Sequence, residues 1–135
     1  MKRKWVFFIL FVTIVTTTLI IWFIWNKPHR NVQNEKGIVV SAIQLIQDFE
    51  NDELSANKKY LNKAIVVSGK VLETSINQDG LPTVTIQSAS LMSNVYCTLK
   101  KEQPIPDAGS IAVIKGICTG KLTDVVLIDA INDTK

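Results

Sequence analysis

Two cysteines, Cys97 and Cys118, have the clearest capacity for covalent chemistry in this 135-residue chain. They lie 21 positions apart without a Cys-x-x-Cys spacing, so they do not indicate a redox-active couple. An even cysteine count in a small domain outside the cytoplasm favours a disulfide, which stabilises a fold by about 2–4 kcal/mol. We therefore predict a Cys97–Cys118 disulfide if the domain is exported, and two buried thiols if it faces the cytoplasm.

The other reactive side chains form no recognisable catalytic pattern. His29 is the only histidine, and it stands outside the region that holds the serines of positions 41 to 110, so these serines lack a histidine base. The chain has no GxxxxGK[ST] loop, no GxGxxG after a strand and no HExxH motif. We predict that the protein is not an enzyme.

Three neighbouring carboxylates, Glu50, Asp52 and Glu53, are the most evident candidates for a cation site. Acidic side chains near the end of a helix are usually exposed to solvent, and this interpretation is favoured here. His29 has no second histidine, cysteine or carboxylate cluster beside it that a metal or haem site would need. The sequence therefore predicts neither a metal nor another cofactor.

Residues 5–25 form an uninterrupted stretch of 21 residues without a formal charge. As a helix this stretch spans roughly 31 Å, which matches the hydrocarbon core of a bilayer. Trp5 stands at one end and Trp22 with Trp25 at the other, where indole rings favour the headgroup level. The stretch is longer than the apolar part of a signal peptide, and no small-x-small cleavage site or lipid-accepting cysteine follows it. We predict an uncleaved transmembrane signal anchor.

The positive charges around this segment set its orientation. Lys2, Arg3 and Lys4 precede it, whereas only Lys27 and Arg30 follow it closely. Because basic residues favour the cytoplasmic side, residues 1–4 are predicted to be a cytoplasmic tail. The chain is then a single-pass protein of the cytoplasmic (inner) membrane, with its C-terminal domain outside the cytoplasm.

The charge of the predicted exported part differs from that of the whole chain. Residues 31–135 contain ten Lys, no Arg and twelve Asp or Glu, so their formal net charge is 10 − 12 = −2. Their aromatic residues are Phe49, Tyr60 and Tyr96. Domains that bind nucleic acid usually present a basic patch with Arg and a set of stacking aromatics. This composition disfavours nucleic acid as the partner.

Residues 26–36 are polar and are predicted to be a linker, which leaves residues 37–135 as the folded domain. Ser41 and Gln44 have the spacing of a capping box at the start of a helix. The following apolar residues recur with a helical period and predict a short amphipathic helix that packs on the rest of the domain, its stripe being Ala42, Leu45, Ile46 and Phe49. A further short helix is predicted over residues 54–60, with Asp52 near its start.

From residue 63 onward the hydrophobic period changes from 3.6 to 2. Turn residues divide this region into five predicted strands, at residues 64–75, 83–88, 94–100, 110–118 and 125–131. Five short strands without a long helix between them are typical of a small closed barrel, which leaves no exposed sheet edge. The predicted fold is therefore mainly β, with one N-terminal transmembrane helix.

Two strand segments echo each other around a glycine. Residues 66–71 and 113–118 share an apolar pair, a polar residue, the glycine (Gly69 or Gly116) and an apolar or Cys position two residues later. A glycine within a strand usually marks a bulge or a sharp bend. In a five-stranded Greek-key barrel the first strand bends and pairs with the fourth, so Gly69 and Gly116 are predicted on neighbouring strands. Two unrelated strand glycines are the alternative.

These patterns together resemble the tRNA_anti-like family of OB-fold proteins over residues 41–131. The segments that carry the resemblance are residues 56–60, 64–71, 95–97, 109–120 and 126–129. The resemblance implies a small five-stranded OB-fold Greek-key barrel preceded by a short amphipathic helix, and a binding role. It supplies no substrate, and the absence of Arg from the domain argues against a role in tRNA binding.

The favoured function is a membrane-tethered, non-enzymatic binding module that contacts an envelope protein or a small ligand. By analogy with the fold, one barrel face would bind the ligand. Polar strand positions of this kind more often form a merely solvated outer face, and that alternative is favoured over binding. The candidate residues are Thr83, Thr85, Gln87, Tyr96 and Thr98.

Two other functions are weighed against this one. An oligonucleotide-binding OB domain is the first alternative, and the negative charge of the domain disfavours it. A haem-type cofactor carrier is the second, because the haem chaperone of cytochrome c maturation shares the layout of N-terminal anchor and exported OB barrel. That chaperone attaches haem through a histidine after the barrel, whereas residues 131–135 here contain none.

Overall fold

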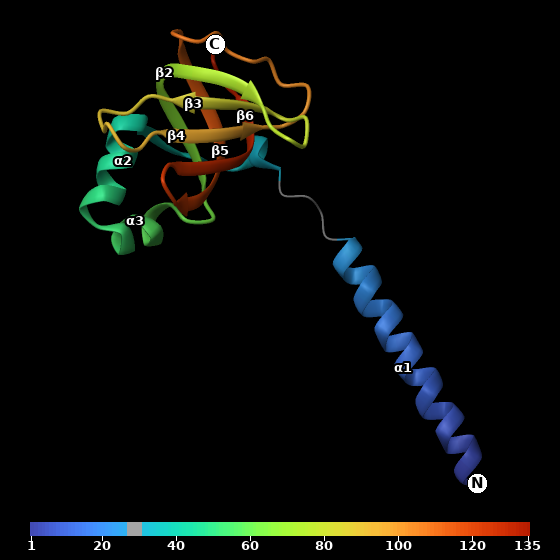
Figure 1. Cartoon of the computed structure of the whole chain (residues 1–135). Coiled ribbons are helices and arrows are strands. Elements are labelled where there is room, and N and C mark those ends of the chain that lie inside the picture. The colour runs from blue at the N-terminus through green and yellow to red at the C-terminus, as the bar shows by residue number, and fades with distance from the viewer. Residues whose placement is uncertain (27–30) are drawn as a thin grey trace. The chain divides into compact units, whose positions relative to one another are not determined.

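The computed structural model describes residues 1–26 and 31–135 (Figure 1). The chain divides into two compact units, Met1–Arg30 and Asn31–Lys135. The first unit contains the helix α1 (Lys2–Trp25), and the second contains all the strands.

Helix α1 is a continuous apolar helix with exposed side chains. Its segment Arg3–Trp25 is long and apolar enough to cross a membrane. A signal sequence near an N-terminus can have the same length and composition. The hydroxyls of Thr13, Thr16 and Thr17 donate hydrogen bonds to backbone carbonyls three or four residues earlier. This arrangement satisfies their polar groups within the helix, as an apolar environment requires.

Five strands of the second unit form the predicted closed barrel. They are β2 (Ala64–Ile76), β3 (Pro82–Ile86), β4 (Val95–Leu99), β5 (Ile111–Lys121) and β6 (Val125–Asn132). Their order is β2-β3-β4-β6-β5, and β5 pairs again with β2 to close the barrel. Each strand overlaps the segment that the alternating pattern predicts, because inward-facing residues of a barrel alternate with outward-facing ones.

Strand β2 bends so that it serves two partners. Its residues 64–70 pair with β5, and its residues 71–76 pair with β3. A register shift between Val71 and Glu73 follows directly after the point where the partner changes. Gly69 lies just before this change, so the predicted bend of the first barrel strand is present.

One strand, β1 (Ile38–Ser41), is absent from the sequence prediction. It runs parallel to β2, with Ile38 beside Ile65 and Ser41 beside Ser68. It occupies the edge of β2 that β3 joins further along. Its four residues run directly into a helix, and a segment this short gives too few alternations to identify a strand.

The predicted linker over residues 26–36 needs a correction. Val32, in the 3₁₀ turn η1 (Val32–Asn34), is fully buried in a small cluster with Ala64 and Ile117. The Lys115 ammonium donates a 3.1 Å hydrogen bond to the Gln33 carbonyl. Residues from 31 onward therefore belong to the barrel unit, and residues 27–30, with His29, lie outside the described part.

Two short helices, α2 (Ala42–Asn51) and α3 (Glu53–Tyr60), precede the barrel strands. The Ser41 hydroxyl accepts a hydrogen bond from the Gln44 backbone N–H, as the capping pattern predicts. The Gln44 side chain does not complete a capping box, because it donates instead to Asp48 at 2.7 Å. Asp52 caps α3 by accepting a 3.1 Å hydrogen bond from the Ser55 backbone N–H.

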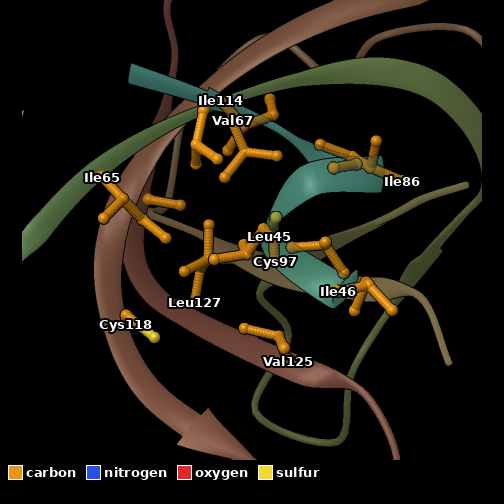
Figure 2. Packing of buried hydrophobic residues seen from close by; sticks show 14 of the residues in the cluster. Leu45, Ile46, Ile65, Val67, Ile86, Cys97, Ile114, Cys118, Val125 and Leu127 are labelled. Carbon is orange, nitrogen blue, oxygen red and sulfur yellow. The ribbon is translucent and has the colours of Figure 1, made fainter. Parts of the chain in front are cut away.

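Helix α2 packs its apolar stripe into the barrel core. Leu45 and Ile46 are fully buried, and Figure 2 shows them among inward-facing side chains of the strands. The core strand residues around them include Ile86, Ile114 and Leu127. The apolar stripe of the helix thus adds to the core formed by the inward side chains of the strands, and the outer faces of the strands are left to contact other molecules.

Candidate ligand-binding face

Four of the five predicted binding residues lie together on the outside of strands β3 and β4. In the antiparallel register Thr83 is opposite Thr98, and Thr85 is opposite Tyr96. The residues between them, including Val84 and Cys97, belong to the buried core. Because successive side chains of a strand alternate between its faces, these four side chains share the outer face. We call Thr83, Thr85, Tyr96 and Thr98 the threonine face.

The threonine face is shallow and uncharged. Thr83 and Thr85 are only 3% and 7% exposed, and Thr98 and Tyr96 are half-buried. Within the described residues no side-chain hydrogen bond engages the hydroxyls of Thr83, Thr85, Thr98 or Tyr96. A hydroxyl is both a donor and an acceptor, so the half-buried Tyr96 and Thr98 can pair with either kind of polar group on a ligand, whereas the buried Thr83 and Thr85 support them from the neighbouring strand.

Neighbouring strands extend this face with residues that the sequence prediction omits. In β2, Glu73 is beside Thr85 and Ser75 is beside Thr83, while Val126 of β6 is beside Tyr96. Glu73 places one carboxylate at the border of the neutral surface. The alternation of β2 after its bulge is the signal that would have identified Glu73 and Ser75.

Gln87 lies apart from the other four predicted residues. Strand β3 ends at Ile86, and the backbone N–H of Gln87 donates to the Lys70 carbonyl at 2.8 Å. Gln87 lines a cleft of about 330 Å³ beside the start of α2, together with Ser41, Ala42, Ile43, Ser68, Gly69, Lys70, Ser88 and Ile111. The structure therefore divides the predicted set between two surfaces.

The two predicted structural glycines lie on neighbouring strands. Gly116 pairs with Ile65, and Gly69 pairs with Ala112, so they are four register positions apart. A Cβ atom at Gly69 would lie 2.5 Å from Ile86 Cγ2 and 3.2 Å from Ala42 Cβ. Gly69 thus allows the start of α2 and strand β3 to approach β2 closely.

The structure holds both cysteines as free, buried thiols in place of the predicted disulfide. Leu127 of β6 pairs with Cys97 of β4 on one side and with Cys118 of β5 on the other. Neighbouring strands lie about 4.8 Å apart, so one intervening strand places the two Cα atoms beyond the roughly 7 Å that a disulfide allows. Burial raises the pKa of both thiols and so lowers their reactivity.

The acidic residues near α2 and α3 take structural roles. Glu50 accepts a 2.8 Å hydrogen bond from the Ser90 hydroxyl, and Asp52 caps α3. Hydrogen bonds from Ser55 hold the pKa of Asp52 below its ordinary value. Within residues 1–26 and 31–135, no three His, Cys, Asp or Glu residues are grouped so that they could hold a metal ion.

The comparison with protein families identifies this barrel. The model of the tRNA_anti-like family matches residues 1–131 of the chain. No curated protein matches this chain. A solved structure from Klebsiella pneumoniae subsp. pneumoniae, described as a "putative nucleic acid-binding lipoprotein", aligns with a TM-score of 0.58. That alignment covers 71% of this chain and 91% of the other at 18% identity, so it shows a shared fold.

The family match extends over the anchor-like helix and the barrel, which is more than half of the chain. The closed five-stranded order of the structure agrees with the fold that the sequence patterns predict. The chain is a member of the tRNA_anti-like family.

Proposed function

We propose that this protein is a non-enzymatic binding module, tethered to the cytoplasmic membrane by α1, with its barrel outside the cytoplasm. The module uses the threonine face to bind a segment of an envelope protein. The main support is that the four residues of this face carry no charge and that Tyr96 and Thr98 present half-buried hydroxyls on its outer side. Hydroxyls of this kind suit the backbone N–H and C=O groups of an extended polypeptide.

A photo-crosslinking amino acid at position 96 tests this proposal in cells that carry the full-length protein. Tyr96 tolerates an aromatic replacement because its side chain is on the outer face. Val39, which is 79% exposed on β1, provides a control position on another wall of the barrel. We expect an envelope protein to be captured from position 96 and not from position 39. Equal capture from both positions, or none from either, would reject the threonine face as the site.

The location of the barrel needs a separate measurement. Protease added to intact cells with a permeabilised outer layer should degrade the barrel unit, whereas the protein should resist extraction by carbonate. A protected barrel would reverse the proposed topology, and release by carbonate would refute the anchor.

Single-stranded nucleic acid is a second candidate ligand, because the structural neighbour is described as a "putative nucleic acid-binding lipoprotein". The threonine face offers one aromatic ring, Tyr96, for stacking, and the barrel unit has a formal net charge of −2. Binding that is driven by phosphate contacts weakens steeply as salt concentration rises. Titration of the full-length protein with an unstructured oligonucleotide at several salt concentrations distinguishes this mode, since we expect no salt-sensitive binding.

A further inference from the structure

Large apolar side chains gather, strongly exposed, around one end of the barrel. Among the described residues of the barrel unit, four of the five most exposed large apolar side chains are Leu91 (101%), Leu122 (87%), Met92 (81%) and Leu54 (76%). Leu61, 38% exposed, lies with Leu122 in a cleft between α3 and the β5–β6 turn. We call Leu54, Leu61, Leu91, Met92 and Leu122 the apolar rim.

Hydrogen bonds connect the three segments that carry the apolar rim. The Ser90 hydroxyl donates to Glu50 at the end of α2, which joins the β3–β4 loop to the helices. The Asn94 backbone N–H donates a 2.7 Å hydrogen bond to Asp124, which joins the same loop to the β5–β6 turn. Figure 1 shows the helices, this loop and this turn at the same end of the barrel unit.

The loop that presents Leu91 and Met92 is held by a network of hydrogen bonds. The Ser88 hydroxyl donates to the Ser93 carbonyl and accepts from the Ser90 backbone N–H. The Ser90 hydroxyl also accepts from the Met92 backbone N–H at 3.3 Å. These bonds hold the loop backbone while its two apolar side chains stay in solvent, so little backbone entropy is lost when they enter an apolar phase.

The length of the chain favours a lipid bilayer as the surface that covers the rim. Only residues 26–31 separate Trp25, at the end of the anchor, from the buried Val32. Fully extended, this connection reaches at most about 25 Å, which is less than the roughly 33 Å diameter of a compact 105-residue domain. The barrel unit of a membrane-anchored chain therefore stays within about its own diameter of the bilayer.

The charges around the apolar rim determine how it would contact lipid. Carboxylates outnumber cations there, and Glu50 and Asp124 accept hydrogen bonds from within the protein. The cations on or next to the rim elements are Lys58, Lys59, Lys63 and Lys121, and Lys59 is already paired with Asp48. Attraction to anionic headgroups therefore does not drive the contact, and the burial of apolar surface does.

We propose that the apolar rim is a lipid-contacting surface, which inserts Leu91, Met92, Leu122 and Leu54 into the interfacial layer of the membrane that holds the anchor. The proposal rests on the proposed membrane tether. Interfacial contact of this kind holds the barrel in one orientation and restricts the directions in which the threonine face can meet a partner.

The test uses full-length protein in phosphatidylcholine nanodiscs, with an environment-sensitive fluorophore on an added cysteine. Leu91→Cys and Met92→Cys report on the rim. Ile76→Cys is the matched control, because Ile76 is 66% exposed and pairs with Pro82 at the other end of β3. The parent protein should take up no label, since Cys97 and Cys118 are buried.

At positions 91 and 92 we expect a blue-shifted emission and a loss of intensity when nitroxide-bearing lipids are included, with neither effect at position 76. Addition of phosphatidylglycerol should leave these signals unchanged. Unshifted, unquenched labels at 91 and 92 on protein that co-elutes with nanodiscs would overturn the lipid contact. The labelled protein can also be measured in native membranes supplemented with nitroxide-bearing lipids. A blue-shifted emission without quenching there would overturn the lipid contact and indicate a protein partner. Protein that fails to co-elute with nanodiscs would refute the tether itself.

Discussion

The hydroxyl of Tyr60 donates a 2.6 Å hydrogen bond to Asp48 Oδ2, twelve residues earlier in the chain. The same carboxylate accepts hydrogen bonds from Lys59 at 2.9 Å and from Gln44 at 2.7 Å. The Tyr60 ring, which is fully buried, stacks on Phe49 with a centroid distance of 6.0 Å. This network fixes α3 against α2 and so positions the pair of helices that closes one end of the barrel.

Replacement of Tyr60 by Phe should lower the free energy of unfolding by about 1–2 kcal/mol, because Asp48 loses one donor while the ring packing remains. Urea titration followed by circular dichroism measures the change. Lys59→Met is the control: the Lys59 side chain is 56% exposed, so solvent screens its ion pair and the loss of stability should be smaller than for Tyr60→Phe. A larger loss for Lys59→Met than for Tyr60→Phe would contradict this assignment.

Acid should destabilise the helix pair through Asp48. Hydrogen bonds from Tyr60, Lys59 and Gln44 hold the pKa of Asp48 below its ordinary value of 3.8. A lowered folded-state pKa gives stability that is complete above the unfolded value and is lost as pH falls through the folded one. The free energy of unfolding should therefore decline below about pH 4 in the wild type, and decline less in Asp48→Asn. Parallel pH curves for the two proteins would refute this role.

At alkaline pH the free energy of unfolding should show the opposite pH dependence, through Tyr60. Burial and the bond to Asp48 raise the pKa of Tyr60 above 10.0. A raised folded-state pKa gives stability that is complete below the unfolded value and is lost as pH rises through the folded one. Wild-type protein should thus lose stability above about pH 10 more steeply than Tyr60→Phe does, as thermal melts at increasing pH would reveal.

An alanine at Gly69 should destabilise the barrel by about 1–3 kcal/mol, because its Cβ atom would clash with Ile86 Cγ2 and press on Ala42. Thermal and urea unfolding measure the effect. Ser68→Ala, one residue earlier on the same strand, adds no atoms and serves as the control. Equal stability of Gly69→Ala and Ser68→Ala would show that the barrel accommodates a Cβ atom at position 69, and would refute the clash with Ile86 and Ala42.

Both cysteines should remain free thiols even in protein that is isolated from the envelope. Native protein should resist alkylation because the thiols are buried and their pKa values are raised, and unfolded protein should take up two labels. Intact-mass spectra with and without reductant provide the count. A mass lower by two hydrogen atoms before reduction would show a disulfide and would require strand β6 to move from between Cys97 and Cys118.

Much of the fold could be predicted from the sequence because the determining signals are local. Alternation over residues 64–75 and 125–131 identifies strands whose inward side chains are buried. Ser41 marks the start of α2, since a capping hydroxyl needs only the next three residues. Gly69 marks the bend of β2 because a missing Cβ signals a close approach of backbone.

Only the tertiary structure decided which distant residues meet. Alternation cannot assign partners, so the insertion of β6 between Cys97 and Cys118 and the parallel pairing of β1 with β2 were not foreseeable. The burial of Val32 depends on packing against Ala64 and Ile117, which a polar local sequence does not reveal. Thr83, Thr85, Tyr96 and Thr98 share a face through strand register, whereas Gln87 leaves it because β3 ends one residue earlier. Local sequence thus determined the elements, and long-range packing determined the surfaces available for binding.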